Sequence, residues 1–370
     1  SVVDVAKTRP IFLLWRSIMQ LFGGAGIAVI MLTAIIGPQG MELYNAEGRS
    51  DKLLPNVTKN AKLIVFIYGS YCIVGTIAYI VAGMPWFDAI NHAFAALSTG
   101  GFSTKVNSIG EYNNLHIEMI TIVLMILGTT NFAAHYVILR GRIKQFMKIT
   151  EVRFMGLLLV VSIPLITLLL FAKTYENVAE SFRIALFQGV SAISTTGFST
   201  VSYVQWPSAA MFLMIMLMII GGGSGSTAGG LKMYRVAVLL KSIKWHFQNY
   251  VIPPYAVRAN SVYRPDGRLF VPARHLLELA YFLMLYLITY LLGVFVMTLH
   301  GFSLQDAMFE FASTLGTVGL SIGLTGPHLP HAVLWTQTIG MFLGRLELVV
   351  VFIVLIKLFQ DINYVTHKKK

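Results

Sequence analysis

The sequence STGGFST at residues 98–104 is nearly repeated as STTGFST at residues 194–200, and a third copy of the pattern T-x-G-[FL]-S lies at residues 317–321. Five matching residues are weak support by themselves, because Ser, Thr and Gly are common in turns. The flanking residues match as well, since an alanine lies ten positions before each threonine. A polar residue also lies seven positions before each threonine; these residues are His92, Gln188 and Glu310. The sequence therefore carries an internal repeat.

Each copy follows a short amphipathic segment that we expect to be a helix too short to cross a bilayer. These segments are residues 87–97, 183–193 and 305–315. An apolar stretch precedes and follows every unit, and about 20 residues of helix suffice to cross the hydrocarbon core. The stretches are residues 61–83, 115–139, 154–172, 209–240, 275–299 and 332–357. Residues 15–36 are typical of the last span of one more unit, so we expect seven spans and three re-entrant loops.

The composition is that of a membrane protein. Of the 370 residues, 56% are hydrophobic and 12% are charged, against about 25% charged in an average soluble domain, and the mean hydropathy is +0.71. We therefore expect an all-α integral membrane protein, with three complete repeats plus half of a fourth around a central pore. The single cysteine, Cys72, excludes a disulfide framework and a Cys-x-x-Cys metal site.

The net charge of +12 does not indicate a nucleic-acid partner, because Lys and Arg collect in the cytoplasmic loops of membrane proteins. If every T-x-G loop enters the lipid bilayer from outside, the segments that face the cytoplasm hold 21 of the 28 Lys and Arg residues. These segments are residues 37–62, 140–153, 232–274 and 357–370. The bias predicts this orientation.

The three loops have the chemistry of a cation filter. Backbone that is not helical is tolerated at membrane depth only where it is buried in protein or lines a water-filled path. Several such loops around one axis could replace the hydration shell of a cation with their carbonyls, and Gly reaches the required backbone conformations. The candidate ion-binding residues are Thr99, Gly100, Gly101, Thr195, Thr196, Gly197, Thr317, Val318 and Gly319. The alternative is that each loop only caps a short helix.

The sequence GGGSGSTAGG interrupts the span after the second complete loop. Each glycine disfavours helix by about 1 kcal/mol relative to Ala, so we expect unwound backbone that lines a cavity and acts as a movable gate. The candidate gate residues are Gly221, Gly222, Gly223, Ser224, Gly225, Ser226, Thr227, Ala228, Gly229, Gly230 and Arg345. A phosphate-binding loop is excluded because Leu231 precedes Lys232 and no Ser or Thr follows it. A face for close helix packing is the alternative.

Arg345 lies within the predicted span 332–357, where a charge should face protein or water. It is either a buried partner of a distant group or a positive barrier to cation flow. Glu347 is only two residues away, so the two side chains point in different directions. The chain has no HExxH, GxSxG or Walker A motif, and no enzyme is indicated.

Together these motifs resemble the Trk/Ktr/HKT superfamily of K⁺ transporters over essentially the whole chain. STGGFST and STTGFST resemble the second and third filter loops, and STLGTVGLS resembles the fourth. GGGSGSTAGGLK resembles the intramembrane loop of the third repeat, GRLE the inner helix of the fourth, and WRSIMQLFGGAGI the inner helix of the first. Most of the first repeat has no counterpart here. GRLE is more similar to Trk proteins and GTVGLS to Ktr proteins.

The resemblance implies M1–P–M2 repeats like those of K⁺ channels. The expected units are residues 1–60 (inner helix 15–36 and a cytoplasmic loop), 61–152 (filter loop 98–104), 153–272 (filter loop 194–200 and gate 221–230) and 273–370 (filter loop 313–321).

The resemblance also implies the function. It implies K⁺ uptake across the bacterial plasma (inner) membrane, with K⁺ held at the filter residues and no organic cofactor. It further implies a homodimer and a cytosolic NAD- or ATP-binding regulatory ring of the RCK type. The alternatives are an alternating-access cation symporter, including a Na⁺-selective member, and an inactive membrane scaffold.

Overall fold

The computed structural model describes residues 5–25, 57–251, 259–326 and 329–367. Within these ranges three helices are long and apolar enough to cross a membrane without a break. They are α4 (Val57–Val81), α9 (Thr150–Lys173) and α13 (Ala273–Leu299). They coincide with the spans predicted before each T-x-G loop, as expected for uninterrupted runs of apolar residues.

The three short amphipathic segments are helices, as predicted. They are α5 (Trp86–Leu97), α10 (Val178–Ile193) and α14 (Leu304–Leu315). Side chains cap two of them: Asn177 accepts a hydrogen bond from the amide of Ala179 at 2.9 Å, and Ser303 accepts one from the amide of Asp306 at 3.2 Å. Each short helix packs against the long helix that precedes it, so the pair forms a helical hairpin.

Two of the three spans that follow the loops differ from the prediction, because each of the two is broken. Residues 115–139 form α6 (Leu115–Thr129) and α7 (Phe132–Leu139), which are bent by 106°. Residues 332–357 lie in α15 (His331–Arg345) and the first half of α16 (Leu348–His367), which are bent by 101°. The expectation of unbroken helices there was wrong.

The two unexpected breaks have local causes. Between α6 and α7, Asn131 caps the second helix by accepting a hydrogen bond from the amide of Ala133 at 2.7 Å, and the hydroxyl of Thr130 donates to Ile126 O at 2.6 Å. Between α15 and α16, Glu347 adopts a left-handed backbone conformation with φ +59°. A side chain that satisfies backbone groups, or a left-handed residue, ends a helix.

The break predicted within residues 209–240 is present. Helix α11 (Ser208–Ile220) stops before the glycine-rich sequence, and α12 (Met233–Val251) starts after it. Of the span predicted at residues 15–36, the structure shows the first part, within α1 (Pro10–Ala25), and residues 26–36 lie outside the described part. Helix α1 packs against α5.

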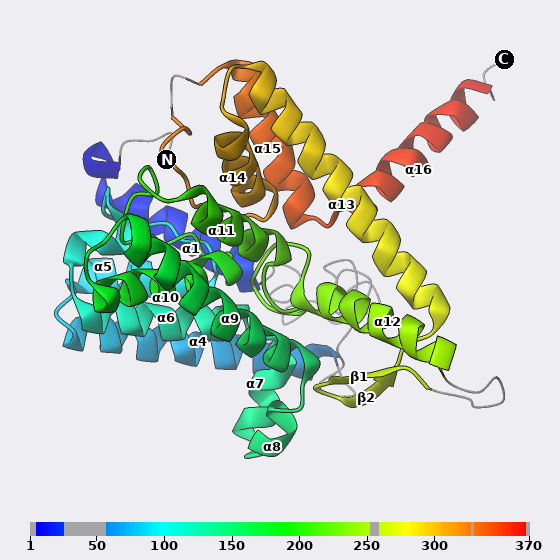
Figure 1. Ribbon diagram of the computed structural model, residues 1–370, viewed down its shortest axis with the longest axis horizontal. Helices are drawn as coiled ribbons and strands as arrows, with labels where there is room; N and C mark the ends of the chain where they lie inside the picture. The colour runs from blue at the N-terminus through cyan, green and yellow to red at the C-terminus, as the bar shows by residue number, and fades with distance from the viewer. Residues whose placement is uncertain (1–4, 26–56, 252–258, 327–328, 368–370) are drawn as a thin grey trace.

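Several small elements were not predicted. Strands β1 (Ser261–Arg264) and β2 (Gly267–Phe270) form an antiparallel hairpin, and α8 (Ile143–Phe146) is a single helical turn between α7 and α9. In Figure 1 the hairpin and α8 lie at the lower edge of the molecule, and α16 projects away from the body at the upper right. One-turn 3₁₀ helices are η1 (Val5–Lys7) and η2 (Ser108–Tyr112).

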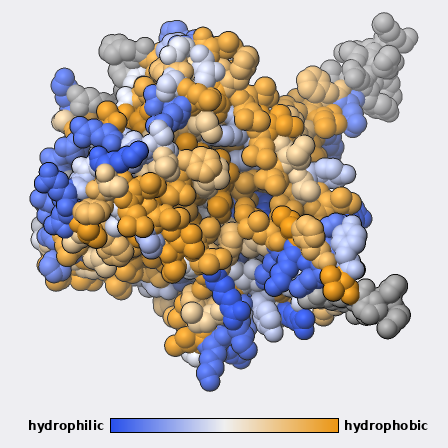
Figure 2. Space-filling model, viewed as in Figure 1, coloured by the Kyte–Doolittle hydropathy of each residue, from blue (hydrophilic) through white to orange (hydrophobic). Residues whose placement is uncertain are grey.

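The surface agrees with a position in a membrane. Figure 2 shows a largely hydrophobic face, with hydrophilic atoms mainly at the left edge, at the lower tip and at the lower right. Helices α4, α9 and α13 contribute exposed apolar side chains such as Phe66, Val160 and Tyr281. Such an apolar surface is suited to lipid rather than to water. The bounds of the four predicted repeats stay a prediction.

Candidate functional site: three loops and the chain segment beneath them

The three T-x-G loops share one backbone conformation. The threonine of each loop is left-handed, which is uncommon for a residue other than Gly. These threonines are Thr99 (φ +50°), Thr195 (φ +55°) and Thr317 (φ +52°). The glycine two positions later is also left-handed in each loop: Gly101 (φ +69°), Gly197 (φ +86°) and Gly319 (φ +95°). The repeat seen in the sequence is therefore a repeat in three dimensions.

Hydrogen bonds to the ends of the short helices produce this conformation. The residue after each threonine donates its amide to a carbonyl in the last turn of the helix, an arrangement typical of a Schellman cap. The bonds are Gly100 to Ala95 at 2.9 Å, Thr196 to Ser191 at 3.1 Å and Val318 to Ser313 at 2.8 Å. The loops thus do cap the helices, as the structural alternative required. Helix capping alone does not explain one feature. Gly would adopt the left-handed conformation without strain, yet all three loops have Thr at that position.

The three T-x-G loops lie side by side. A Cβ atom added to Gly101 would overlap the carbonyl oxygen of Thr196, and one added to Gly197 would overlap the carbonyl oxygen of Val318. A Cβ atom on Gly319 would meet nothing nearer than the Cα of Gly197, at 3.9 Å. Backbone therefore contacts backbone from loop to loop, in chain order, and only Gly permits this approach.

The polar residue seven positions before each threonine hydrogen-bonds to the segment that follows the loop glycine. His92 Nε2 lies 2.9 Å from Ser103 Oγ, and Gln188 Nε2 donates to Thr200 Oγ1 at 3.2 Å. The carboxylate of Glu310 accepts hydrogen bonds from Ser321 Oγ at 2.6 Å, from the amide of Ile322 at 2.9 Å and from Thr325 Oγ1 at 3.0 Å. The three residues are almost fully buried. They make local hydrogen bonds, as expected for positioning residues.

Asp88 makes a similar contact beside the first of these loops. Its carboxylate accepts hydrogen bonds from Thr104 Oγ1 at 2.6 Å and from the Tyr112 hydroxyl at 2.9 Å, and Lys105 Nζ lies 3.5 Å away. Burial and the hydrogen bond to Asp88 raise the pKa of Tyr112, which lies in the loop after the filter residues. The phenol therefore stays protonated and keeps its role as a donor.

Gln20 of α1 contacts the first of the three loops, at residues 98–104. Its Nε2 donates to the carbonyl oxygen of Gly100 at 2.7 Å, and its Oε1 lies 3.4 Å from the amide of Phe102. Arg16, one helical turn earlier, stacks on the ring of Phe102 at 4.0 Å. The sequence pattern did not single out either residue. Their signal was their spacing of four on one helix, which is too common to be specific.

The glycine-rich sequence, residues 221–230, lies against the bases of the loops. Thr195 Oγ1 accepts a hydrogen bond from the amide of Gly229 at 2.7 Å. Thr227 Oγ1 lies 3.0 Å from the carbonyl of Leu97 and 2.9 Å from that of Gly128. A Cβ atom on Gly229 would overlap Thr317 Oγ1. The segment thus touches the ends of all three short helices or their loops.

The break in the second repeat holds the other end of this segment. The amide of Gly223 donates to Thr129 O at 3.0 Å, and the amide of Phe132 donates to Gly225 O at 3.1 Å. The amide of Ser224 donates to Glu151 Oε1 at 2.8 Å. The polar groups freed by two broken helices therefore satisfy one another, as buried backbone must.

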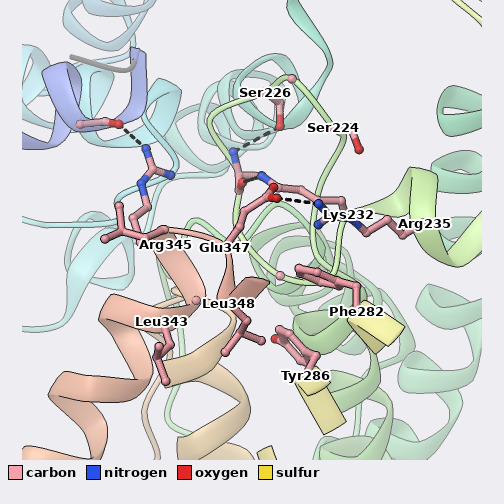
Figure 3. A pocket seen from close by; sticks show the side chains of 17 residues that line it. Ser224, Ser226, Lys232, Arg235, Phe282, Tyr286, Leu343, Arg345, Glu347 and Leu348 are labelled. Carbon is pink, nitrogen blue, oxygen red and sulfur yellow. Dashed lines mark hydrogen bonds and ion pairs between the residues drawn. The ribbon is translucent and has the colours of Figure 1, made fainter. Parts of the chain in front are cut away.

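Charged side chains line a cavity of about 340 Å³ on the other side of this segment. Figure 3 shows Arg345 and Glu347 reaching into it from one wall, with Lys232 and Arg235 on the other. Arg345 donates to Thr227 O at 3.1 Å and also to Gly23 O. Arg235 Nη2 donates to Glu347 Oε2 at 2.7 Å, and its guanidinium lies 3.9 Å from the centre of the Phe282 ring.

The structure brings the predicted residues together in two layers. The nine candidate filter residues form the three contiguous loops, and the ten glycine-rich residues lie next to them with Arg345 in contact. Sequence reasoning missed Ser191 and Ser313, both four positions before their threonines, which hydrogen-bond to Phe198 O at 2.6 Å and to the amide of Gly319 at 3.1 Å. It also missed the partnership of Glu347 with Arg235. Two serines at equal spacing were a detectable signal, whereas the ion pair joins residues 112 positions apart.

Comparison with known proteins gives a consistent result. The family profile described as a cation transport protein, TrkH, matches residues 1–365. The Trk system potassium uptake protein TrkH of Halomonas elongata is 32% identical over 353 residues, which cover 92% of this chain and 72% of the relative. The protein of the same name from Escherichia coli K12 is 30% identical over 94% of this chain and 73% of its own length.

A solved structure is similar as well. The crystal structure of the potassium transporter TrkH from Vibrio parahaemolyticus matches with a TM-score of 0.81 and 28% identity. The match covers 95% of this chain and 74% of that one. The similarity therefore extends over nearly all of the chain described above and is not confined to its loops.

Proposed function

The chain belongs to the TrkH family of cation transport proteins, and from that premise we propose that it takes up K⁺ through one pore lined by its three T-x-G loops. The chain is an integral membrane protein of the plasma membrane, and its relatives are transporters of potassium rather than enzymes. K⁺ is proposed as the transported ion because those relatives are potassium uptake proteins. The residues that bind K⁺ are inferred from the geometry of the three loops.

The shared backbone of the three loops is the observation that supports a filter most strongly. Equivalent residues with equivalent dihedral angles present equivalent carbonyls, and the loops contact one another in chain order. Carbonyl oxygens arranged around an axis replace the hydration shell of an alkali cation. K⁺ is accordingly assigned to Thr99, Gly100 and Gly101 and to their counterparts in the third and fourth repeats.

Residues 221–230 act as the gate beneath this filter. The segment is not helical, it is held by hydrogen bonds to separate helices, and it contacts the filter through Thr195. Arg345 fixes the segment through Thr227 and adds a positive charge to the cavity below. A shift of Arg345 would release the segment and remove a barrier to cations at once.

The orientation follows from the distribution of charge. The segments rich in Lys and Arg face the cytoplasm, so the loops open to the outside. We also propose that the chain forms a homodimer. A cytosolic ring of RCK-type subunits that bind NAD or ATP is its proposed regulator. The basic segments 140–153 and 232–274 could contact such a ring, and lipid headgroups explain their charge as well.

An alternating-access symporter is the second candidate, and one observation favours it. Three inner helices are broken within the described residues, where the sequence indicated one break, and broken helices are typical of the substrate sites of secondary transporters. This candidate places the ion at residues 221–230. An inactive scaffold, the third candidate, requires that the loop glycines tolerate substitution.

Uptake of ⁸⁶Rb⁺ into proteoliposomes separates these candidates. The test variant is Gly197→Ser, and the matched control is Gly83→Ser, because Gly83 is also left-handed (φ +95°) but has open space where a side chain would lie. We expect Gly197→Ser to lose Rb⁺ uptake or discrimination against Na⁺, and Gly83→Ser to retain both. Equal behaviour of the two variants contradicts the filter and leaves the symporter or the scaffold.

A further inference from the structure

A protrusion that is both basic and apolar is formed by segments of the second and third repeats. This lower protrusion consists of α7, α8 and the β1–β2 hairpin (Figure 1). We propose that the lower protrusion binds the headgroups of anionic phospholipids in the cytoplasmic leaflet. The inference rests on the inward orientation proposed above, and goes beyond the transport function.

The direction of α7 places the lower protrusion along the membrane surface. Helix α6 packs beside the spanning helix α4, and α7 is bent by 106° from α6. A helix at that angle to a span runs nearly parallel to the bilayer plane. Gly141 (φ +70°) then ends α7, and the amide of Arg142 returns to Val137 O at 3.1 Å. The chain therefore stays at this level through α8 before α9 enters the membrane.

Three large apolar side chains of this segment have more than half of their surface exposed. They are Leu139, Ile143 and Met147, with 59%, 63% and 56% of their surface accessible. In Figure 2 the lower tip of the molecule shows hydrophobic atoms mainly on the left, toward the spans, and hydrophilic atoms on the right. Water is a poor solvent for such side chains, whereas the boundary between headgroups and acyl chains accommodates them.

Basic side chains alternate with the apolar ones. Arg140, Arg142, Lys144 and Lys148 are exposed, and residues 138–148 contain no Asp or Glu. Arg142, Lys144 and Lys148 line an open depression whose far wall includes Tyr263 and Gly267 of the hairpin. A phosphate in this depression would meet three cations.

Hydrogen bonds hold the hairpin in place as that wall. Gln145 Nε2 donates to Pro265 O at 2.9 Å, and the amide of Tyr263 donates to Thr150 Oγ1 at 3.0 Å. The hairpin carries one carboxylate, Asp266, between Arg264 and Arg268, so its own charge is positive as well. The depression is therefore a fixed feature and keeps its excess of positive charge.

The combination favours lipid over the other anionic partners. A soluble phosphate compound would need the three cations but not the exposed Leu139, Ile143 and Met147. A cytosolic protein would bury those side chains only if it reached the membrane boundary beside α9. Anionic phospholipid supplies a phosphate for the depression and acyl chains for the apolar side chains at the same depth.

Native mass spectrometry of the intact protein with added phosphatidylglycerol or phosphatidylcholine tests the proposal. The test variant is Arg142→Gln/Lys144→Gln/Lys148→Gln. The matched control is Lys244→Gln/Arg274→Gln/Lys357→Gln, which removes the same charge from exposed residues elsewhere. A second test variant, Leu139→Ser/Ile143→Ser, removes the apolar contact and keeps every charge. Thermal unfolding of each variant confirms that it is folded.

We expect the wild-type protein to retain phosphatidylglycerol in preference to phosphatidylcholine. The basic test variant should lose at least half of that preference, the control should keep it, and the apolar variant should retain less of both lipids. Equal losses in the basic variant and the control would mean that net charge alone attracts the lipid, and would overturn the proposal. Unchanged retention in both test variants would also overturn it, and would leave the lower protrusion as a contact for a cytosolic protein.

Discussion

The Cα of Gly197 lies so close to the carbonyl oxygen of Val318 that a side chain at residue 197 would overlap this oxygen. Residue 318 is the middle residue of the next T-x-G loop, so the backbones of these two loops are in direct contact. Gly101 has the same relationship to Thr196 in the loop after its own. The loops consequently depend on one another for their positions, and disturbing one carbonyl disturbs the adjacent loop.

The first prediction compares Gly101→Ala with Gly319→Ala. Both residues are left-handed, so alanine costs each about 1–2 kcal/mol of backbone strain. Only at Gly101 would the new Cβ displace a carbonyl, because at Gly319 the nearest atom is 3.9 Å away. We expect Gly101→Ala to reduce ⁸⁶Rb⁺ uptake by about tenfold or more and Gly319→Ala to reduce it less. Equal loss in both variants would show that steric contact between loops is unimportant.

The second prediction concerns the contact between filter and gate. Thr195 is fully buried, and its Oγ1 accepts the amide of Gly229 at 2.7 Å. Thr195→Val removes the acceptor and leaves a buried donor unpaired, which costs about 1–3 kcal/mol. We expect a lower unfolding temperature and a changed basal Rb⁺ flux. Thr195→Ser keeps the hydroxyl and is the control; if it behaves like Thr195→Val, the hydrogen bond is not the cause.

Local signals in the sequence were sufficient to predict most of the fold. The long spans and the short helices follow from runs of apolar residues and from the match among His92, Gln188 and Glu310. The left-handed threonines could not be predicted, because a propensity scale would assign Gly there. The glycines indicated close approach, but not which carbonyl each one approaches. That information lies in contacts between residues about 100 positions apart, such as Gly101 with Thr196.

The breaks in the inner helices show a different limit. The glycine-rich sequence was recognisable, since glycines in a row disfavour helix. The break at Thr130 and Asn131 had a weaker signal, the polar sequence GTTN, and the apolar residues on both sides concealed it. The break before Leu348 had almost none, because GRLE contains neither a proline nor a run of glycines. There the pairing of Glu347 with Arg235 is a tertiary contact that propensity does not report.

The third prediction is a stability effect at the junction of the second and third repeats. Arg183 of α10 forms a two-point ion pair with Glu118 of α6, with both N–O distances at 2.7 Å. The Glu118 side chain is buried and the Arg183 side chain is about one-third exposed. Glu118→Gln should lower the free energy of unfolding by about 1–3 kcal/mol, since it removes a charge-assisted bond. The control is Glu176→Gln at an exposed position, which should change little by the same thermal measurement.

The fourth prediction concerns the ion pair between Arg235 and Glu347. It joins the start of α12, just after the gate, to the break before α16. Both side chains are mainly buried, and a double-mutant cycle with Arg235→Ala and Glu347→Ala should give a coupling energy of about 1 kcal/mol. We expect each single variant to raise basal Rb⁺ uptake, because the pair restrains the gate. Strictly additive effects on basal uptake would mean that the two residues act independently.

The central claim is that the three T-x-G loops coordinate the transported ion with their carbonyls. Anomalous diffraction from crystals grown in Tl⁺, an ion of nearly the size of K⁺, tests this most directly. We predict an anomalous peak between the loops, within coordination distance of the backbone oxygens around Gly101, Gly197 and Gly319. A peak confined to the cavity beside Arg345, with none between the loops, would contradict the account and place the ion site at the broken helices.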